Sequence, residues 1–336
     1  MANLLQSTRE YWDRTVKDEV WMKIPVFNLL LQRNKDVFDP GTSWKCTRGK
    51  ADLEASVQEY HGGNTPLTAS ETTTKETAQW YAKEMQIGLI IPRRELFQNK
   101  PGESRIFDLK EDTVKQGRDA LRLKMRTNLY RAASAARDAD AVGFQGIVDA
   151  LTHDVQYGGL TRTISSGTNT WWQGASVSGL YTDQATAATM SIAFLRQLYD
   201  ACSMYGDVSE SNFVFIMGPT NWRTIQAEAE SHRLSMERGE STRWGITDVT
   251  IDGGMRIVVD PYLKDTAGTR DEYVFGLHLP DWKLKIDPER GFGTMGEWVD
   301  QSQIEGGRDI VLARSFVRGN LMCGSPRNSI YRSNVS

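Results

Sequence analysis

The stretch FDLKEDTVKQGRDALRLKMRTNLYRAASAARDA, residues 107–139, carries the strongest helical pattern in the chain. Asp108 is followed three residues later by Glu111, which is the spacing of a capping box at a helix start. Apolar residues then recur near one face of the expected helix, from Val114 to Ala136. The pattern predicts a helix over 108–137, about 45 Å long at the usual rise per residue, laid along a sheet.

The opposite face of this expected helix is basic, and its candidate residues are Lys115, Arg118, Arg122 and Arg126. One interpretation is a surface that faces DNA weakly, without reading its sequence. The other is a solvated or salt-bridged face, which the acids Glu111, Asp112 and Asp119 on the same stretch favour. The chain has 40 Lys and Arg against 43 Asp and Glu, a net charge of -3. This balance argues against nucleic-acid binding as its main task.

Downstream of Gly143 the pattern alternates between helices and strands. Helices are predicted at 143–151, 189–206 and 221–233, and a buried strand at FVFIMGPT, residues 213–220. Further strands are predicted at 248–260, with a turn at Gly253–Gly254, and at 271–279 and 282–290. This part reads as an α/β region with its own core. The segment 309–332, with Val311, Ala313, Phe316 and Leu321 in alternation, predicts long antiparallel strands packed on the long helix.

The N-terminal part is expected to be extended. Trp12, Val16, Val20 and Trp21 have near-helical spacing up to Pro25, so residues 1–38 predict a helical arm with a break. The segment HGGNTPLTASETTTKET, residues 61–77, has Leu67 as its only large aliphatic side chain. Strand-like flanks at 54–60 and 76–96 favour a long two-stranded loop over a disordered linker. An isolated hairpin is marginal in water, so its stability would come from a neighbour.

The stretch GGLTRTISSGTNTWWQG, residues 158–174, places Trp171 and Trp172 in a polar loop without periodicity. The pair can be explained as an anchor for a pocket on another chain, because buried tryptophan is a frequent interface hot spot. It can equally be explained as a plug inside one subunit.

The search for enzymatic motifs finds one weak candidate, GFGTMG, with Gly291, Gly293 and Gly296 in dinucleotide-binding spacing. The polar, glycine-interrupted residues after it do not predict the required helix. His61, His153, His232 and His278 are scattered, and Cys46, Cys202 and Cys323 predict free thiols. No apolar run approaches the roughly 18 residues of a membrane span. We therefore expect no catalytic residue, no cofactor, no metal site and no membrane partner.

The predicted order is arm, polar hairpin, long helix, α/β region and returning strands. In this order, the chain resembles the major capsid protein of tailed bacteriophages. Three stretches strengthen the resemblance: IVDALTHDVQYGGLTRTISSGTNTWWQG (147–174), FVFIMGPTNW (213–222) and FVRGNLMCGSPRNSIY (316–331). The resemblance implies the α+β Hong Kong 97-type capsid fold. It implies an N-terminal arm at 1–40 and an extended loop at 41–78. The peripheral domain would take 79–150, with the spine helix at 108–137, and return strands at 281–324. The axial domain would take 151–280 and 325–336, with Trp171 and Trp172 as an anchor beside the domain junction.

The resemblance also implies what the protein does. It would assemble in the host cytoplasm as hexamers and pentamers of itself into the icosahedral capsid of a virion, around packaged double-stranded DNA that it meets without specificity. It implies a separate scaffolding protein and a portal, and it allows a decoration protein. Contacts between copies are expected in the arm and loop, at Trp12, Trp21, Trp44, Tyr60, Leu67, Glu71 and Lys75. The alternatives are an encapsulin-like compartment, a tail-tube protein and, remotely, a nucleotide-dependent enzyme using the glycines at 291–296.

Overall fold

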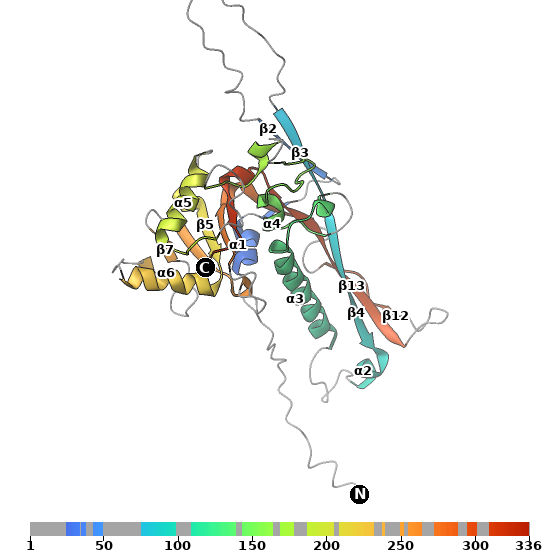
Figure 1. Cartoon of the computed structure of the whole chain (residues 1–336). Helices are drawn as coiled ribbons and strands as arrows, with labels where there is room; N and C mark the ends of the chain where they lie inside the picture. The colour runs from blue at the N-terminus through green and yellow to red at the C-terminus, as the bar shows by residue number, and fades with distance from the viewer. Residues whose placement is uncertain are drawn as a thin grey trace, which may run out of the picture. The chain divides into compact units, whose positions relative to one another are not determined.

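The computed structural model divides the chain into two compact units (Figure 1). Unit 1 combines residues 1–22, 85–124 and 289–317, and unit 2 combines residues 23–84, 125–288 and 318–336. The structure describes residues 25–33, 35–37, 43–49, 75–98, 109–138, 143–163, 169–177, 187–204, 208–231, 237–238, 249–251, 255–263, 272–287, 294–300 and 309–335.

Unit 2 is built on a mixed sheet with the strand order β14-β9-β5-β8-β7-β6. The strands are β14 (Ile330–Arg332), β9 (Val274–His278), β5 (Phe213–Met217), β8 (Met255–Val259), β7 (Val249–Ile251) and β6 (Glu237–Arg238). β5 and β8 are parallel, and the other neighbours are antiparallel. Every residue of β5 is buried. A continuous apolar run such as FVFIM is typical of a strand that is covered on both faces.

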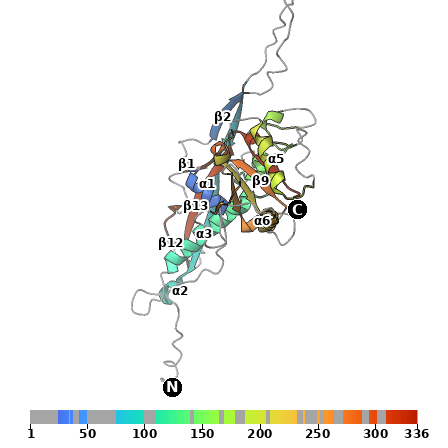
Figure 2. The ribbon, with the colours of Figure 1, turned by 90° about the vertical axis from the view of Figure 1, so that its left-hand side faces the viewer.

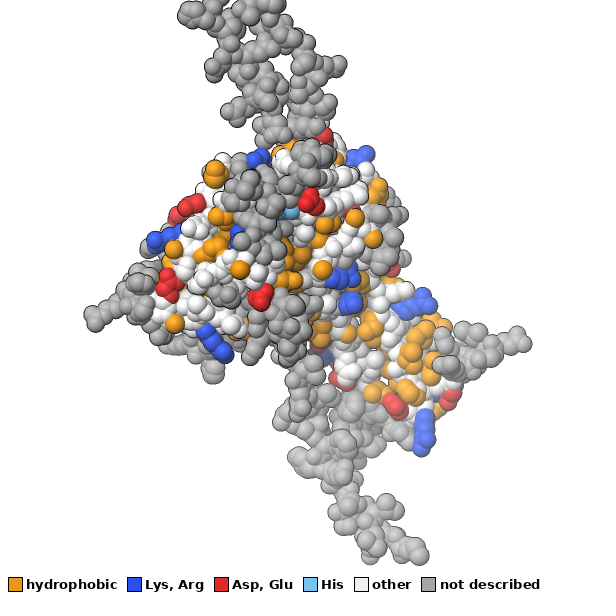
Figure 3. Space-filling view, viewed as in Figure 1, with side chains coloured by type: hydrophobic (Ala, Val, Ile, Leu, Met, Phe, Trp, Pro, Cys, Tyr) orange, Lys and Arg blue, Asp and Glu red, His pale blue; other side chains and the backbone are white. Residues whose placement is uncertain are grey.

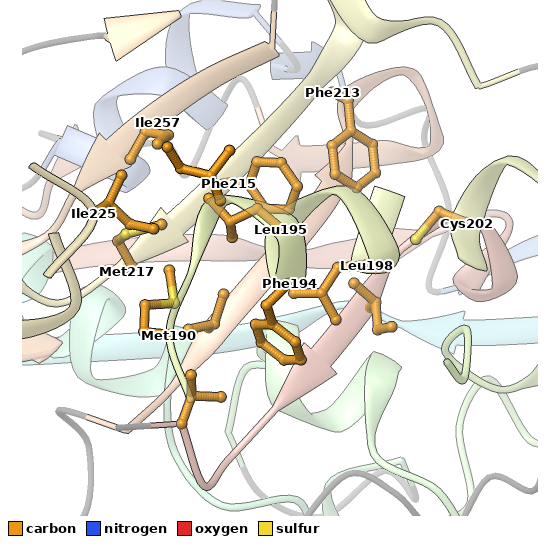
Figure 4. Close-up of a cluster of buried hydrophobic side chains, with 14 of the residues drawn as sticks. Met190, Phe194, Leu195, Leu198, Cys202, Phe213, Phe215, Met217, Ile225 and Ile257 are labelled. Carbon is orange, nitrogen blue, oxygen red and sulfur yellow. The ribbon is translucent and has the colours of Figure 1, made fainter. Parts of the chain in front are cut away.

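One face of this sheet packs on α5 (Ile192–Ser203) and α6 (Pro219–Ser231). Figure 4 shows Phe213, Phe215 and Met217 of β5 meeting the apolar stripe of α5. The hydroxyl of Ser191 accepts a hydrogen bond from the Phe194 N–H at 3.0 Å and caps α5. On the other face, α1 (Pro25–Arg33) contacts β8.

A second sheet has the order β1-β10-β13-β11, and β4 and β12 also pair with β13. Its strands are β1 (Lys35–Val37), β10 (Trp282–Ile286), β13 (Ile310–Cys323), β11 (Thr294–Met295), β12 (Val299–Asp300) and β4 (Lys83–Pro92). The last five residues of β13 pair with β10 inside unit 2. Its earlier residues pair with β11 and β12 inside unit 1.

In unit 1, the helix α3 (Leu109–Leu129) lies alongside β4 and β13 (Figures 1 and 2). A Cβ atom on Gly117 would stand 2.5 Å from Leu89 Cδ2, so the helix approaches β4 closely at this glycine. Leu89 and Ile91 are buried on that face. α2 (Arg93–Gln98) follows β4, and the Arg93 N–H donates to the Asp309 carbonyl at 3.1 Å.

The remaining elements belong to unit 2. They are the two-stranded sheet of β2 (Ser43–Gly49) and β3 (Lys75–Tyr81), the helix α4 (Ile147–Leu151), and short 3-10 turns at Ala135–Arg137, Thr170–Trp172, Glu210–Asn212, Pro261–Leu263, Leu279–Asp281 and Pro326–Asn328. The predicted helices are present as α4, α5 and α6, but residues 143–146 and 189–191 are not helical and α6 begins two residues earlier than expected. The buried strand at Phe213 is confirmed as β5, which ends at Met217, and the hairpin at 248–260 is confirmed. The expected break at Pro25 is the start of α1.

The long helix is shorter than predicted. It ends at Leu129, eight residues before Arg137, and its 21 residues span about 31 Å. The structure gives the reason: a Cβ atom on Gly146 would lie 2.3 Å from the Asn128 carbonyl oxygen and 2.7 Å from that of Leu129. The chain at Gly146 therefore occupies the space next to the last helical carbonyls. Tyr130 then turns to Asp260, to which its hydroxyl donates at 2.8 Å.

The predicted strand at 309–332 is confirmed as β13 and β14, with Ala313 and Leu321 buried, but Phe316 was placed on the wrong face. Ala313, Ser315 and Val317 are the buried alternate residues, so Phe316 lies on the opposite face. The prediction failed because a small polar side chain, Ser315, occupies a buried position.

Candidate functional site: the root of the β2–β3 hairpin

The hairpin of β2 and β3 is joined to unit 2 by its buried face. Trp44 and Trp80 are directly opposite each other, as are Cys46 and Ala78. Trp44, Ala78 and Trp80 are buried, and Cys46 is half-buried. On the other face, the hydroxyls of Thr47 and Thr77 are 2.9 Å apart. The alternation gives the hairpin one apolar face, which fixes its register.

A tight turn at residues 157–160 packs against β3 and is hydrogen-bonded to it. Tyr157 and Leu160 exchange two backbone hydrogen bonds, and the Gly158 carbonyl accepts from the Gln79 N–H at 2.8 Å. Gly158 has φ +63°, a conformation that favours glycine. A Cβ atom there would stand 3.0 Å from Ala78 Cβ and 3.2 Å from the Trp80 ring. Only glycine lets the turn come this close to the hairpin.

The double tryptophan lies in the same cluster. Trp172 is 1% exposed, and its Nε1 donates to the Tyr157 carbonyl at 3.0 Å. Its ring stacks with Tyr157 at 6.3 Å between centroids and lies 6.1 Å from the Trp80 ring. Trp171 is 7% exposed. With so little free surface, the pair packs within its own chain, which favours the intramolecular interpretation over a pocket on another chain.

Arg162 fills the space beneath this cluster and is 1% exposed. Its guanidinium donates to four backbone carbonyls: those of Val155, Ala150, Asp149 and Trp172, at 2.5, 2.7, 2.9 and 3.3 Å. It also lies 5.4 Å from the Tyr157 ring centroid. Burial lowers the pKa of Arg162 to about 10. The side chain ties three backbone segments together as a fork of fixed donors.

Asp138 holds the turn from the other side and is 5% exposed. Its carboxylate accepts the N–H groups of Gly158 and Gly159, both at 2.6 Å, and the side-chain amide of Gln145 at 2.7 Å. Burial raises the pKa of Asp138, and these three hydrogen bonds together with the charge of Arg162 oppose the rise.

The hairpin is also attached to the end of β13. The Arg48 Nε donates to the Gly324 carbonyl at 2.8 Å, and the Cys323 N–H donates to the Tyr157 hydroxyl at 2.8 Å. Lys285 of β10 lies over the Trp44 ring at 5.6 Å. The root of the hairpin, where β2 and β3 meet the rest of unit 2, is therefore held by contacts with several segments. These contacts fix the direction of the two strands.

The structure corrects one of the predicted contacts between copies. Trp44 is 7% exposed and packs inside its own chain, because it faces the same side of the hairpin as Trp80. Lys75 is exposed at the start of β3, opposite Gly49. The others, Trp12, Trp21, Tyr60, Leu67 and Glu71, lie outside the described residues.

The predicted basic face of α3 is only partly a surface. Lys115 and Arg118 are exposed, and Arg122 lies 3.5 Å from Asp119. Arg126 is 4% exposed, with its guanidinium 4.4 Å from the Tyr262 ring, so its place on the basic face is wrong. Arg126 and Tyr262 both belong to unit 2, and the aromatic ring covers the charge.

The weak dinucleotide-binding candidate GFGTMG is only partly described, and its last glycine lies between two strands. The Gly296 N–H, between strands β11 and β12, donates to the Arg314 carbonyl at 2.8 Å, and the described residues 297–300 after it contain no helix. Gly291 and Gly293 lie outside the described residues.

His278 Nδ1 is 2.8 Å from Asp281, and the Ser329 hydroxyl accepts from the His278 backbone and the Trp282 ring N–H. Across the described ranges, no group of three potential metal ligands and no helix of membrane-spanning length and apolarity is found.

Sequence reasoning missed Asp138, Tyr157 and Arg162. The pair Gly158–Gly159 directly after a tyrosine was an available turn signal, since both glycines adopt positive φ. The sequence does not mark Asp138 or Arg162, because most of their hydrogen-bond partners are backbone groups, which any residue type supplies.

The comparisons with known proteins identify the fold. No protein-family model and no curated protein matches the sequence. Among solved structures, the capsid asymmetric unit of cyanophage A-1(L) matches with a TM-score of 0.65 and 13% identity, covering 97% of this chain and 96% of that chain. The holo-SrpI encapsulin complex from Synechococcus elongatus matches with a TM-score of 0.58 and 10% identity, covering 99% and 95%. The capsid of a native GTA particle matches with a TM-score of 0.55 and 10% identity, covering 97% and 96%. Over nearly its whole length, the chain therefore has the α+β fold of phage capsid and encapsulin shell proteins.

Proposed function

We propose that this chain is the major capsid protein of a tailed phage, and that many copies assemble into an icosahedral shell around double-stranded DNA. The observation that carries the proposal is the likeness to the cyanophage A-1(L) capsid subunit over 97% of this chain at a TM-score of 0.65. The proposed work is association, with no catalytic turnover. Hexamers and pentamers of the chain, a separate scaffolding protein, a portal and an optional decoration protein are the partners we propose, with virion assembly in the host cytoplasm.

We assign the parts of a Hong Kong 97-type subunit as follows. α3 would be the spine helix of the peripheral domain, and the β5 sheet with α5 and α6 would form the axial domain. The assignment is supported by unit 1, which combines residues 85–124 with 289–317 around α3, and by the separate core of unit 2. The sequence-based boundaries at 40, 78, 150, 280 and 324 remain our proposal.

The hairpin is proposed to lie on a neighbouring copy. Its root is held by buried tryptophans and by hydrogen bonds that the hairpin donates to the Gly158 and Gly324 carbonyls. The residues between its strands, 50–74, are mostly polar, with a run of threonines and a few small or aliphatic side chains. A polar extension on a rigid root gains stability by pairing its backbone with another chain. Standard contacts bury about 1,600 Å², and an overlapping loop extends this area.

Unit 1 offers an exposed apolar surface for such contacts. Val299 is directly opposite Leu312 in the β12–β13 pair, and a Cβ atom on Gly88 would point to Leu312 as well. Ile90 shares the face of Gly88, while Leu89 faces α3, so this face is the one turned away from the helix. Ile90 is 55% exposed and Val299 51% exposed. Figure 3 shows apolar side chains gathered at the lower right, where Figure 1 draws β4, β12 and β13.

Electron microscopy of the purified chain tests the proposal by asking whether it forms closed shells. The decisive variant replaces residues 50–74 by Asn-Gly, a two-residue turn that closes β2 on β3 between Gly49 and Lys75. We expect a folded subunit, with the same unfolding free energy within about 1 kcal/mol, that forms no shells.

A matched control exchanges the same residues for a glycine-serine segment of equal length, which separates loop length from loop sequence. Normal shells from the Asn-Gly variant would refute the role of the hairpin. Shells that enclose a protein cargo in place of DNA would favour the encapsulin alternative, which the SrpI likeness supports.

A further inference from the structure

The turn at residues 157–160 connects one carboxylate to the hairpin. On its outer side the Gly158 carbonyl accepts from Gln79 of β3. On its inner side the Gly158 and Gly159 N–H groups both point to Asp138 at 2.6 Å. The hydrogen bond between β3 and the turn therefore depends on the Asp138 carboxylate, which holds the turn in place.

The Asp138 carboxylate is the shared acceptor of three N–H donors. Gly158 and Gly159 have φ of +63° and +77°, so their two N–H groups form a concave site for a negatively charged oxygen pair. The third donor is the Gln145 side-chain amide. Removing the carboxylate would leave three donors without this acceptor in a buried place, which costs far more than the net value of an ordinary hydrogen bond.

The hydrophobic core around β5 in unit 2 is built from other residues. The cluster of α5, α6 and β5 includes Cys202, Phe215 and Ile225, and it contains neither Asp138 nor any residue of the turn or of the hairpin. Proteins open locally in units that share contacts, at a lower free energy than global unfolding. The hairpin, the 157–160 turn and Asp138 are linked in this way by hydrogen bonds, so we expect them to open as one unit.

We propose that Asp138 is a positioning residue that latches the 157–160 turn under β3, and that loss of the latch opens the hairpin root while the β5 core stays folded. The proposal concerns the isolated subunit and does not rest on the shell-forming function. In a shell, the same latch would set the direction in which the hairpin leaves the subunit.

The chain carries its own reporters for this opening. Cys46 is half-buried on β2, opposite Ala78, the neighbour of Gln79, whose N–H donates to Gly158. Cys202 is buried in the α5 core, and burial raises the pKa of its thiol. A raised pKa and a closed environment both slow alkylation, so Cys202 reacts only when the core opens.

The test is the rate of alkylation of each cysteine by N-ethylmaleimide, followed by peptide mass spectrometry, in wild type and in Asp138→Asn. Asparagine keeps the size of the side chain, but its NH₂ group would face one of the glycine N–H donors. We expect Cys46 to react about tenfold faster or more, the factor for losing one hydrogen bond to a charged acceptor, with Cys202 unchanged.

Asp149→Asn is the matched control. Asp149 is 2% exposed, and its carboxylate also accepts two backbone N–H groups, from Ser134 at 3.1 Å and Gly146 at 2.8 Å. It should leave the Cys46 rate within about twofold, because neither described hydrogen bond of the carboxylate reaches the hairpin and the Asp149 carbonyl that Arg162 contacts is kept. The proposal fails if Asp138→Asn leaves Cys46 unchanged, or if Cys46 and Cys202 accelerate together.

A measurement on the wild-type chain keeps the inference testable if the variants do not fold. In hydrogen exchange, the amides of 157–160 should exchange together with those of β3 and before those of β5. Exchange of the 157–160 amides as slow as that of Phe213–Met217 would overturn the latch.

Discussion

The sheet around β5 and the part of the second sheet inside unit 1 differ in how completely their own chain covers them. In the first, Val214 and Phe215 point to opposite faces and are 1% and 0% exposed. In the second, the alternate residues Leu89 and Ile90 are 4% and 55% exposed. One sheet is complete within the subunit, and the other has an apolar face that remains in solvent. Stability of the subunit should therefore reside in the first sheet, and association in the second.

Phe215→Ala should have the largest effect on the isolated subunit. The side chain is fully buried between β5 and the α5 core and contacts the Phe213 ring at 5.1 Å between centroids. Removing it leaves a cavity, and we expect a loss of about 3–5 kcal/mol in unfolding free energy by urea denaturation. A loss below about 1 kcal/mol would contradict the view that this sheet holds the subunit together.

The regular elements of this core were predictable from sequence, because their signals are local. FVFIM is apolar throughout, and α5 carries its apolar stripe at helical spacing behind the Ser191 cap. The end of α3 was not predictable, because it is set by Gly146 and Asp260, which lie far along the chain. Propensity favoured a longer helix, and tertiary contacts prevailed.

The hairpin root shows the same limit. Strand β3 lies at the start of the predicted strand at 76–96, but β2 at 43–49 was not predicted, and the other expected strand, 54–60, lies outside the described residues. The apolar face of the hairpin includes Trp44, which the sequence alone suggested as a contact with other copies. The latch escaped prediction because a carboxylate that accepts backbone N–H groups leaves no pattern in the sequence. Arg162 escaped for the same reason, since all its described hydrogen bonds go to carbonyls.

Two strand glycines provide a smaller and more local comparison. In β13, a Cβ atom on Gly319 would stand 2.2 Å from the Lys285 carbonyl oxygen of β10. In β4, a Cβ atom on Gly88 would meet only Leu312 Cδ1, at 3.9 Å. Gly319→Ala should force the backbones apart and lower the unfolding free energy by about 1–3 kcal/mol. Gly88→Ala should be neutral or stabilise by about 0.5 kcal/mol, since alanine is the better strand residue.

Thermal denaturation of both variants beside wild type gives the answer. Equal destabilisation by the two substitutions would show that the sheet face at Gly88 is as crowded as the backbone at Gly319. That result would remove the structural basis for an open face on unit 1.

The smallest effect on subunit stability, and the sharpest test of the comparison, is expected from Ile90→Glu. The side chain is 55% exposed, so the change in unfolding free energy should stay within about 0.5 kcal/mol. Association should nevertheless fail, because a charge would be buried without a partner in any contact that covers this face.

Gln86→Glu is the control, since it adds the same charge on the same face of β4 without removing an apolar side chain. Light scattering of the three proteins at equal concentration measures assembly. If Ile90→Glu assembles like wild type, the exposed face is not a contact between copies, and association must be carried by other surfaces of the chain.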